Sequence, residues 1–156
     1  MAKGSKLDQE TGDKLKKLGI QIVSSIQKGE NPGFEIPIRA LSNVKFNPKT
    51  QTIDMGKDTQ ERQFFNTNMA RKFMQTLLVA STVKEDLLGS GKTTSIRDLY
   101  YMTKHTVKGT HENTFEEQDE SDPVIEDLEV SVDSLREELH LFASNKGAMV
   151  GDMTVV

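Results

Sequence analysis

The chain has 156 residues, of which 35% are hydrophobic and 28% are charged, and this composition indicates one globular domain, or one domain with an arm. The absence of cysteine excludes a disulfide framework and a thiolate metal site. No apolar run approaches the roughly 20 residues of a membrane span, and no apolar signal-peptide core follows Met1, so the cytoplasm is the expected compartment.

Formal charge is unevenly divided along the chain. Residues 1–111 carry 18 Lys and Arg against 11 Asp and Glu, whereas residues 112–156 carry 2 against 13. The net charge of −4 therefore conceals a basic first part and an acidic last part. Such a chain can present a basic face to nucleic acid despite its overall acidity. A chance division with all charges solvated fits equally well.

The first third of the chain has the pattern of one helix followed by short strands. Leu15, Leu18, Ile22 and Ile26 recur at three- and four-residue steps, which predicts an amphipathic helix over residues 10–28 that packs on its own domain or on a partner subunit. Pro37 limits the next apolar segment to an edge strand or an extended arm. The expected order is this strand, two strands joined by a hairpin turn, and a charged loop, at residues 34–39, 43–46, 52–55 and 57–62.

Residues 64–88 carry the strongest helical pattern of the first half, with a stripe that includes Met69, Phe73 and Leu77. Asn66 or Thr67 can cap its start, and Gly89 lies just past its end.

The segment that follows, residues 89–94, reads Gly-Ser-Gly-Lys-Thr-Thr and superficially resembles a phosphate-binding loop. Asp86 stands where that motif requires a glycine, and a helix rather than a strand precedes the segment, so a nucleotide site is not expected. A flexible connection remains, in which Lys92 and the next helix N-terminus could hold one backbone phosphate.

Residues 93–105 predict a short helix that carries both tyrosines of the chain. Ser95 followed by Asp98 fits a capping box. Because residues three and four apart are neighbours on a helix, Tyr100 should pack inward with Ile96 and Leu99. Tyr101 should point outward on the other face, together with Arg97, Lys104 and His105.

The outward tyrosine is a candidate nucleophile. A phenol has a pKa of about 10, and a nearby positive charge favours the phenolate. The same cation can hold the phosphate that a phenolate attacks. Tyr101 could therefore act in phosphoryl transfer with Arg97 as its helper. The alternative is a surface tyrosine stacked on an arginine, which is a common arrangement.

Residues 112–129 contain nine acids and no base. A metal cluster is one interpretation, but the acids lack the spacing of a calcium loop, so a solvated acidic linker is favoured. A helix of about five turns is then predicted from Ser121 to Phe142 by apolar residues at alternating steps of three and four. Residues 148–156 have the pattern of a further strand.

This order of elements predicts an α+β fold. It fits a winged helix-turn-helix domain with a small N-terminal sheet and an N-terminal amphipathic helix. The tyrosine helix would then lie where a DNA backbone passes. The expected DNA contacts are Arg71, Lys72, Lys92, Lys104 and His105.

Six short segments together resemble the A subunits of archaeal topoisomerase VI, which are type IIB topoisomerases related to the meiotic double-strand-break transesterase. The most informative is Arg97-Asp98-Leu99-Tyr100-Tyr101. The others are Glu35-Ile36-Pro37-Ile38-Arg39, Ala70-Arg71-Lys72-Phe73-Met74-Gln75, Glu112-Asn113-Thr114-Phe115, Glu120-Ser121-Asp122 and Leu135-Arg136-Glu137-Glu138-Leu139.

The resemblance implies a catabolite-activator-like fold for the winged domain and the chemistry of an ATP-dependent topoisomerase. The family's nucleophile corresponds to Tyr101, and its invariant arginine corresponds to Arg97. The expected product is a 5′-phosphotyrosyl link beside a free 3′-hydroxyl. The implied partners are double-stranded DNA, a second copy of the same subunit and a GHKL-type B subunit that binds ATP, in an A2B2 assembly without a membrane.

The resemblance also implies Mg²⁺ held by a Toprim domain, which would follow where this chain stops, so no metal ligand is expected here. The predicted organisation is an N-terminal arm and helix at residues 1–30, a winged-helix domain at residues 31–147, and the start of a further strand or Toprim region at residues 148–156. Without a Toprim domain and a B subunit, the short chain is expected to be inactive. The alternative function is a non-catalytic DNA-binding or subunit-docking module that has kept the fold.

Overall fold

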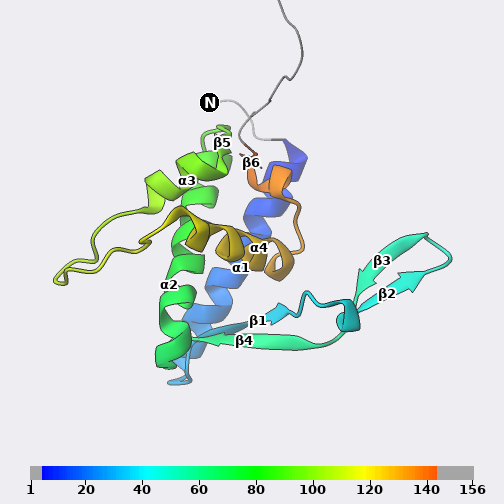
Figure 1. Cartoon of the computed structure of the whole chain (residues 1–156), viewed down its shortest axis with the longest axis horizontal. Helices are drawn as coiled ribbons and strands as arrows, with labels where there is room; N and C mark the ends of the chain where they lie inside the picture. The colour runs from blue at the N-terminus through cyan, green and yellow to red at the C-terminus, as the bar shows by residue number, and fades with distance from the viewer. Residues whose placement is uncertain (1–4, 144–156) are drawn as a thin grey trace, which may run out of the picture.

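The computed structural model describes residues 5–143, and the strand expected at residues 148–156 lies outside this range. Within the described part, four α-helices are combined with three two-stranded sheets, so the fold belongs to the mixed α and β class, as predicted. Figure 1 shows a body built mainly of helices, from which one β-hairpin projects.

The first helix, α1 (Lys6–Gln27), begins earlier than periodicity predicts because a capping box precedes the apolar stripe. The Asp8 amide donates to the Ser5 hydroxyl at 3.1 Å, and the Ser5 amide donates to the Asp8 carboxylate at 2.8 Å. Gly29, with φ of +71°, follows the end of the helix. The buried stripe is formed by Thr11, Leu15, Leu18 and Ile22.

The second helix, α2 (Thr67–Thr82), starts at the Asn66 cap, whose side-chain oxygen accepts the Asn68 amide at 3.0 Å. It continues as a π-helical segment, η2 (Val83–Leu88), so the helical extent predicted for residues 64–88 is largely correct although the last turns are wound more widely. This segment buries Val83, Leu87 and Leu88.

Strand β1 (Gly33–Pro37) is an edge strand, as its proline predicts, and it pairs antiparallel with β4 (Thr59–Gln63). The charged loop predicted for residues 57–62 is therefore wrong. Most β4 side chains are polar and exposed, so they give no apolar alternation, and the strand is specified by backbone pairing with β1. Phe34 and Ile36 turn into the core.

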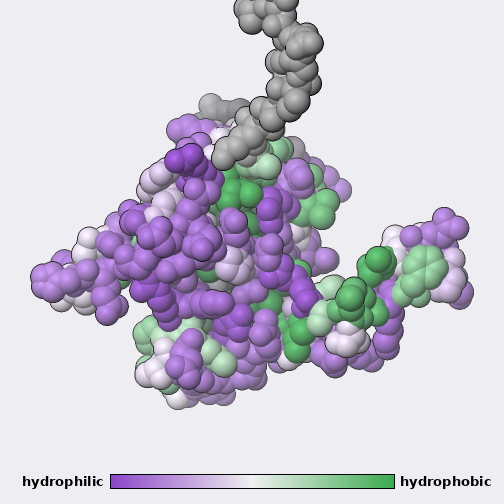
Figure 2. Space-filling model, viewed as in Figure 1, coloured by the Kyte–Doolittle hydropathy of each residue, from purple (hydrophilic) through white to green (hydrophobic). Residues whose placement is uncertain are grey.

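The second sheet is the predicted hairpin of β2 (Val44–Asn47) and β3 (Thr52–Met55), and it does not join β1 and β4 in a common sheet. Its register pairs Val44 with Met55 and Phe46 with Ile53, which places these apolar residues on one face. Figure 2 shows apolar surface on this projecting hairpin, and Phe46 and Ile53 are 65% and 71% exposed.

The long helix predicted from residue 121 to residue 142 is wrong. Helix α4 (Ser121–Ser131) ends early, and a 3₁₀ turn, η4 (Arg136–Leu139), follows. The chain reverses where Asp133 and His140 adopt φ of +46° and +60°. Residues 130–134, Val-Ser-Val-Asp-Ser, span the end of α4 and consist of residues with lower helix propensity than Ala, Leu, Glu or Lys.

One hydrophobic core joins the helices, β1 and the C-terminal turn, and it includes the fully buried Leu99, Phe115, Ile125 and Leu139. A short parallel pair connects β5 (Thr94–Ser95) to β6 (Leu141–Phe142). In the part of the chain that the structure describes, no helix is long and apolar enough to cross a membrane.

Candidate active site

The two tyrosines lie on α3 (Ile96–Thr103), a helix of eight residues. The Ser95 hydroxyl caps it by accepting the Asp98 amide at 3.0 Å, as predicted. The Asp98 carboxylate, however, accepts the Ser95 hydroxyl at 2.8 Å instead of the Ser95 amide, so the predicted capping box is only half formed. The buried side of the helix is formed by Leu99, Tyr100 and Thr103.

Tyr100 and Tyr101 face opposite environments, and this confirms the prediction from helical spacing. Tyr100 is 6% exposed and packs edge-on against Phe115 with ring centroids 6.4 Å apart, whereas Tyr101 is 57% exposed. The two tyrosine rings contact each other with centroids 5.1 Å apart. The Tyr101 phenol is therefore open to a large substrate, and the Tyr100 ring supports it from below.

Arg97 is the cation that accompanies the exposed phenol. Its Nη2 lies 3.5 Å from the Tyr101 hydroxyl, and its Cζ lies 5.9 Å from the centre of the Tyr101 ring. The hydrogen bond to the Tyr101 hydroxyl raises the pKa of Arg97 above its ordinary value. A guanidinium in this place can hold a phosphate oxygen beside the phenol and stabilise negative charge that develops there.

Lys104 does not flank Tyr101 as the helical spacing predicts. Its ammonium turns to the inner tyrosine, with Nζ 2.6 Å from the Tyr100 hydroxyl and 2.6 Å from the Glu116 carbonyl oxygen. Lys104 is the C-cap of α3, and its backbone is extended rather than helical. Its side chain therefore does not follow the helical spacing. Its hydrogen bond to the Tyr100 hydroxyl raises the pKa of Lys104.

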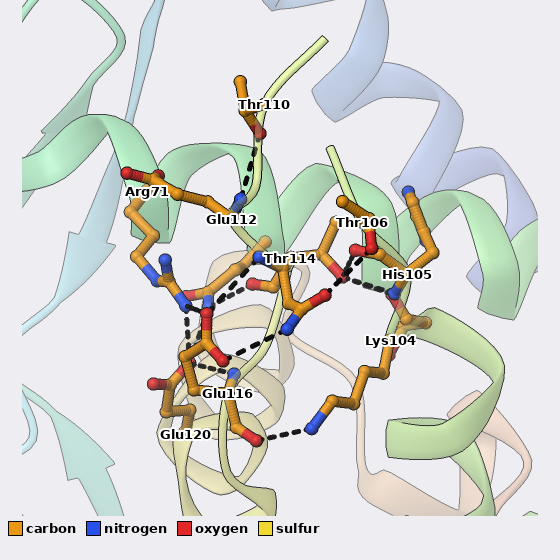
Figure 3. A network of polar contacts seen from close by, with 12 residues as sticks. Arg71, Lys104, His105, Thr106, Thr110, Glu112, Thr114, Glu116 and Glu120 are labelled. Carbon is orange, nitrogen blue, oxygen red and sulfur yellow. Dashed lines mark hydrogen bonds and ion pairs between the residues drawn. The ribbon is translucent and has the colours of Figure 1, made fainter. Parts of the chain in front are cut away.

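The start of the acidic segment folds back onto α2 and α3, as Figure 3 shows. Arg71 Nη2 lies 3.3 Å from the Glu120 carboxylate and 3.8 Å from that of Glu116. The Gln75 amide donates to the Thr114 carbonyl at 2.7 Å and to the Glu120 carboxylate at 3.1 Å. The Asn113 side chain and amide hold the pKa of Glu116 below its ordinary value.

The prediction of a solvated acidic linker over residues 112–129 is therefore wrong. Besides the Arg71 contacts, the buried Asp127 carboxylate accepts Arg62 at 3.0 Å, and Glu129 pairs with Arg136 at 2.6 Å. Composition alone does not predict these pairs because their basic partners lie elsewhere in the chain. Five of the nine acids in this segment pair with arginines of the same fold, namely Glu116, Glu120, Glu126, Asp127 and Glu129.

The predicted DNA contacts are spread over several elements. Lys72 on α2, Lys92 in the loop before α3, and His105 just after α3 are exposed. Arg71 is held by carboxylates, so a DNA phosphate would have to displace them.

Reasoning from the sequence missed the structural use of residues 113–116. The Thr114 hydroxyl donates to the Thr103 carbonyl at 2.7 Å and accepts the His105 amide at 3.0 Å, which closes the end of α3. These residues belong to a segment that carried the family resemblance, and the sequence holds no other signal for them. Their contacts depend on a chain reversal that has no periodic pattern.

No group of three or more His, Asp or Glu side chains within residues 5–143 is arranged to hold a metal ion. The carboxylates of Glu116 and Glu120 are engaged by Arg71, Gln75 and Asn113, and that of Asp98 by the Ser95 hydroxyl. The described residues therefore do not fit a metal centre.

Comparison with known proteins places this site within a described family. Residues 71–141 match the family model "Type IIB DNA topoisomerase". The chain is 45% identical over 147 residues to the A subunit of type 2 DNA topoisomerase 6 from Pyrococcus horikoshii, covering 94% of this chain and 38% of that protein. The corresponding subunit from Sulfurisphaera tokodaii is 38% identical over 162 residues, covering 97% of this chain and 42% of that protein. The chain thus spans about two fifths of these relatives, and it matches their N-terminal part.

Proposed function

We propose that this chain, whose residues 71–141 belong to the type IIB DNA topoisomerase family, is the nucleophile-bearing part of a topoisomerase A subunit. The observation that carries the proposal is the exposed Tyr101 phenol, supported by the Tyr100 ring and lying 3.5 Å from the Arg97 guanidinium within the family-matched region. Tyr101 is the nucleophile and Arg97 is its electrostatic partner.

The reaction is a transesterification on the DNA backbone. The Tyr101 oxygen forms a bond to phosphorus, and the bond from phosphorus to the 3′-oxygen breaks. The 3′-hydroxyl leaves with a proton, and a 5′-phosphotyrosyl link remains. Because one phosphodiester replaces another, religation needs no energy input. Arg97 contributes by holding a non-bridging phosphate oxygen and by stabilising the charge that builds up on it.

DNA would be held by its phosphates and not by its bases. We place a winged-helix or catabolite-activator-like arrangement around α3, with Lys72, Lys92 and His105 as exposed contacts. The docked acids Glu116 and Glu120 would keep Arg71 from binding phosphate strongly.

Duplex passage would require partners. We propose a second copy of the same subunit to cut the opposite strand and a GHKL-type B subunit to bind ATP. The described residues do not fit Mg²⁺, so the ion would have to be held by another part of the enzyme. No step above is assigned to it.

A second candidate is a non-catalytic module that docks a partner subunit. The observation that favours it is the apolar surface of α1, where Ile20, Val23 and Ile26 are each more than half exposed. Ile20 and Val23 border a groove against α2 that is also lined by Leu77 and Ala80. A docking role is compatible with catalysis, so the experiment must test the chemistry itself.

The test is a covalent trap in the assembled enzyme. A full-length A subunit that contains this sequence, with the B subunit, Mg²⁺, a non-hydrolysable ATP analogue and supercoiled DNA, is treated with denaturant. Protein attached to DNA 5′ ends is expected with the native sequence and with Tyr100→Phe, and is expected to be absent with Tyr101→Phe. An adduct that survives Tyr101→Phe contradicts the proposal. Loss of the adduct in every form, with DNA binding retained, favours the docking module.

A further inference from the structure

Tyr100, Lys104 and Glu116 meet at the C-terminal end of the tyrosine helix. The Tyr100 hydroxyl donates to the Glu116 carbonyl oxygen at 2.9 Å, and the Lys104 ammonium donates to both of these oxygens at 2.6 Å. Lys104 Nζ also lies 5.1 Å from the centre of the Tyr100 ring. These contacts join both ends of a turn that leaves α3 and returns over it, as Figure 3 shows for Lys104 and Glu116.

The contacts of the outer tyrosine lead back to this segment through Tyr100. Helix α3 has eight residues, too few to be stable alone. The Tyr101 ring and hydroxyl contact Arg97, which is itself exposed, and the Tyr100 ring. The Tyr100 ring is therefore the buried support of Tyr101. The orientation of Tyr100 is in turn held by Lys104 and Glu116.

We infer that Lys104 is a positioning residue for Tyr101, acting through Tyr100, in place of the DNA contact expected from the sequence. The inference rests on the proposed function, because positioning matters only where the Tyr101 oxygen must meet a phosphorus atom in line. A displacement of about 1 Å in such a reaction can cost about a hundredfold in rate. A phosphate at Lys104 would have to compete with two oxygens that its ammonium already binds.

The first test observes the Tyr101 ring directly and does not depend on catalysis. The chain contains only two tyrosines, so ring-labelled tyrosine gives two sets of NMR signals that Tyr100→Phe assigns. Lys104→Met should shift the Tyr101 ring signals and weaken the contacts between Tyr101 and Arg97. Lys104→Arg, which keeps the charge and the donors, should restore them. Unchanged Tyr101 signals in Lys104→Met would overturn the inference.

The second test asks whether Lys104 binds a phosphate. Each protein–phosphate contact contributes about one unit to the slope of log K against log salt. Lys104 and Lys92 are both exposed, but the Lys104 ammonium is already bound to two oxygens. Lys104→Met should therefore leave this slope unchanged for duplex DNA, whereas Lys92→Met should lower it by about one. A slope that falls by about one in Lys104→Met would show a phosphate contact and overturn the inference.

The third test measures chemistry in the assembled enzyme. Lys104→Met should lower the cleavage rate at saturating DNA by roughly tenfold while leaving KM unchanged. In the double variant Lys104→Met, Tyr100→Phe, the fold decrease in cleavage rate should be smaller than the product of the two single fold decreases. Both substitutions remove the same Lys104–Tyr100 contact, so their effects should not be independent. A multiplicative loss, or a change in KM alone, contradicts the inference. If the native enzyme forms no Tyr101 adduct, the proposed function fails, while the ring signals and the salt slope still decide the role of Lys104.

Discussion

Tyr100 and Tyr101 are adjacent in the chain, yet they have different physical roles. The inner ring is buried and hydrogen-bonded, and the outer ring is exposed beside a guanidinium. A helix turns by about 100° per residue, so neighbouring residues can serve the core and the substrate separately. The site therefore joins a buried, hydrogen-bonded support to an exposed phenol, which we propose as the nucleophile.

Arg97 should matter to the chemistry more than to DNA affinity. We expect Arg97→Ala to lower cleavage at saturating DNA by about a hundredfold, because one preorganised donor to a developing charge is typically worth that much. Arg97→Lys should recover part of the activity, since a lysine keeps the charge but not the planar pair of donors. Lys49→Ala, in the turn between β2 and β3, is the matched loss of a positive charge. Equal losses in Arg97→Ala and Lys49→Ala would contradict this role.

Glu116 should make stability depend on pH. Hydrogen bonds from Asn113 hold its pKa below the ordinary 4.5. Folding therefore favours the ionised form, so this contribution is complete above about pH 4.5 and is lost as the pH falls through the lower folded pKa. Urea unfolding between about pH 6 and about pH 3 should show a loss that is smaller in Glu116→Gln. An identical pH dependence in both proteins would show that the contact contributes nothing.

At the scale of single elements, α3 depends on its first turn. Ser95→Ala removes the hydroxyl that accepts the Asp98 amide and should lower the free energy of unfolding by about 1 kcal/mol. Ser81→Ala, at an exposed position of α2, is the matched control and should change stability little. Chemical denaturation measures both. A Ser95→Ala protein as stable as the control would mean that β5 and β6 alone hold the start of α3.

The elements that could be predicted from the sequence are those with a local signal. Apolar stripes and caps located α1, α2 and α3, and the turn at Asn47 and Pro48 located the hairpin. Strand β4 consists of polar residues and has no apolar alternation, so only its backbone pairing with β1 reveals it. The apolar steps after Ser131 continued the helical pattern, but the helix ends among weak helix formers, and Asp133 just beyond its end has a positive φ.

For the molecule as a whole, several ion pairs join acidic and basic residues that are far apart in the sequence. The acidic segment contacts Arg62 and Arg71 of the basic first region, whereas Lys72, Lys92 and Arg97 of that region are exposed. Periodicity could predict that Tyr101 and Arg97 share a face. It could not predict that Lys104 turns to Tyr100, because that contact requires residues 113–116 to fold back over the helix.

The salt dependence of DNA binding should show whether Lys72 and Lys92 contact DNA phosphates. We expect Lys72→Ala combined with Lys92→Ala to lower the slope of log K against log salt by about two units, because each lysine is proposed to contact one phosphate. Lys49→Ala combined with Lys57→Ala removes the same charge near the projecting hairpin and should leave the slope unchanged. Equal changes in both pairs would indicate a general effect of charge and would contradict the proposed interface. Fluorescence anisotropy with one duplex at several salt concentrations provides the slopes.

The most direct test of the central claim is to identify the tyrosine that becomes linked to DNA. A duplex in which sulfur replaces the bridging 3′-oxygen at the cleavage position offers a better leaving group and prevents religation. After reaction with the assembled enzyme and digestion, trypsin should release a peptide from Asp98 to Lys104, and fragmentation should place the nucleotide on Tyr101. A nucleotide on Tyr100, or on a residue outside α3, would contradict the assignment of Tyr101 as the nucleophile.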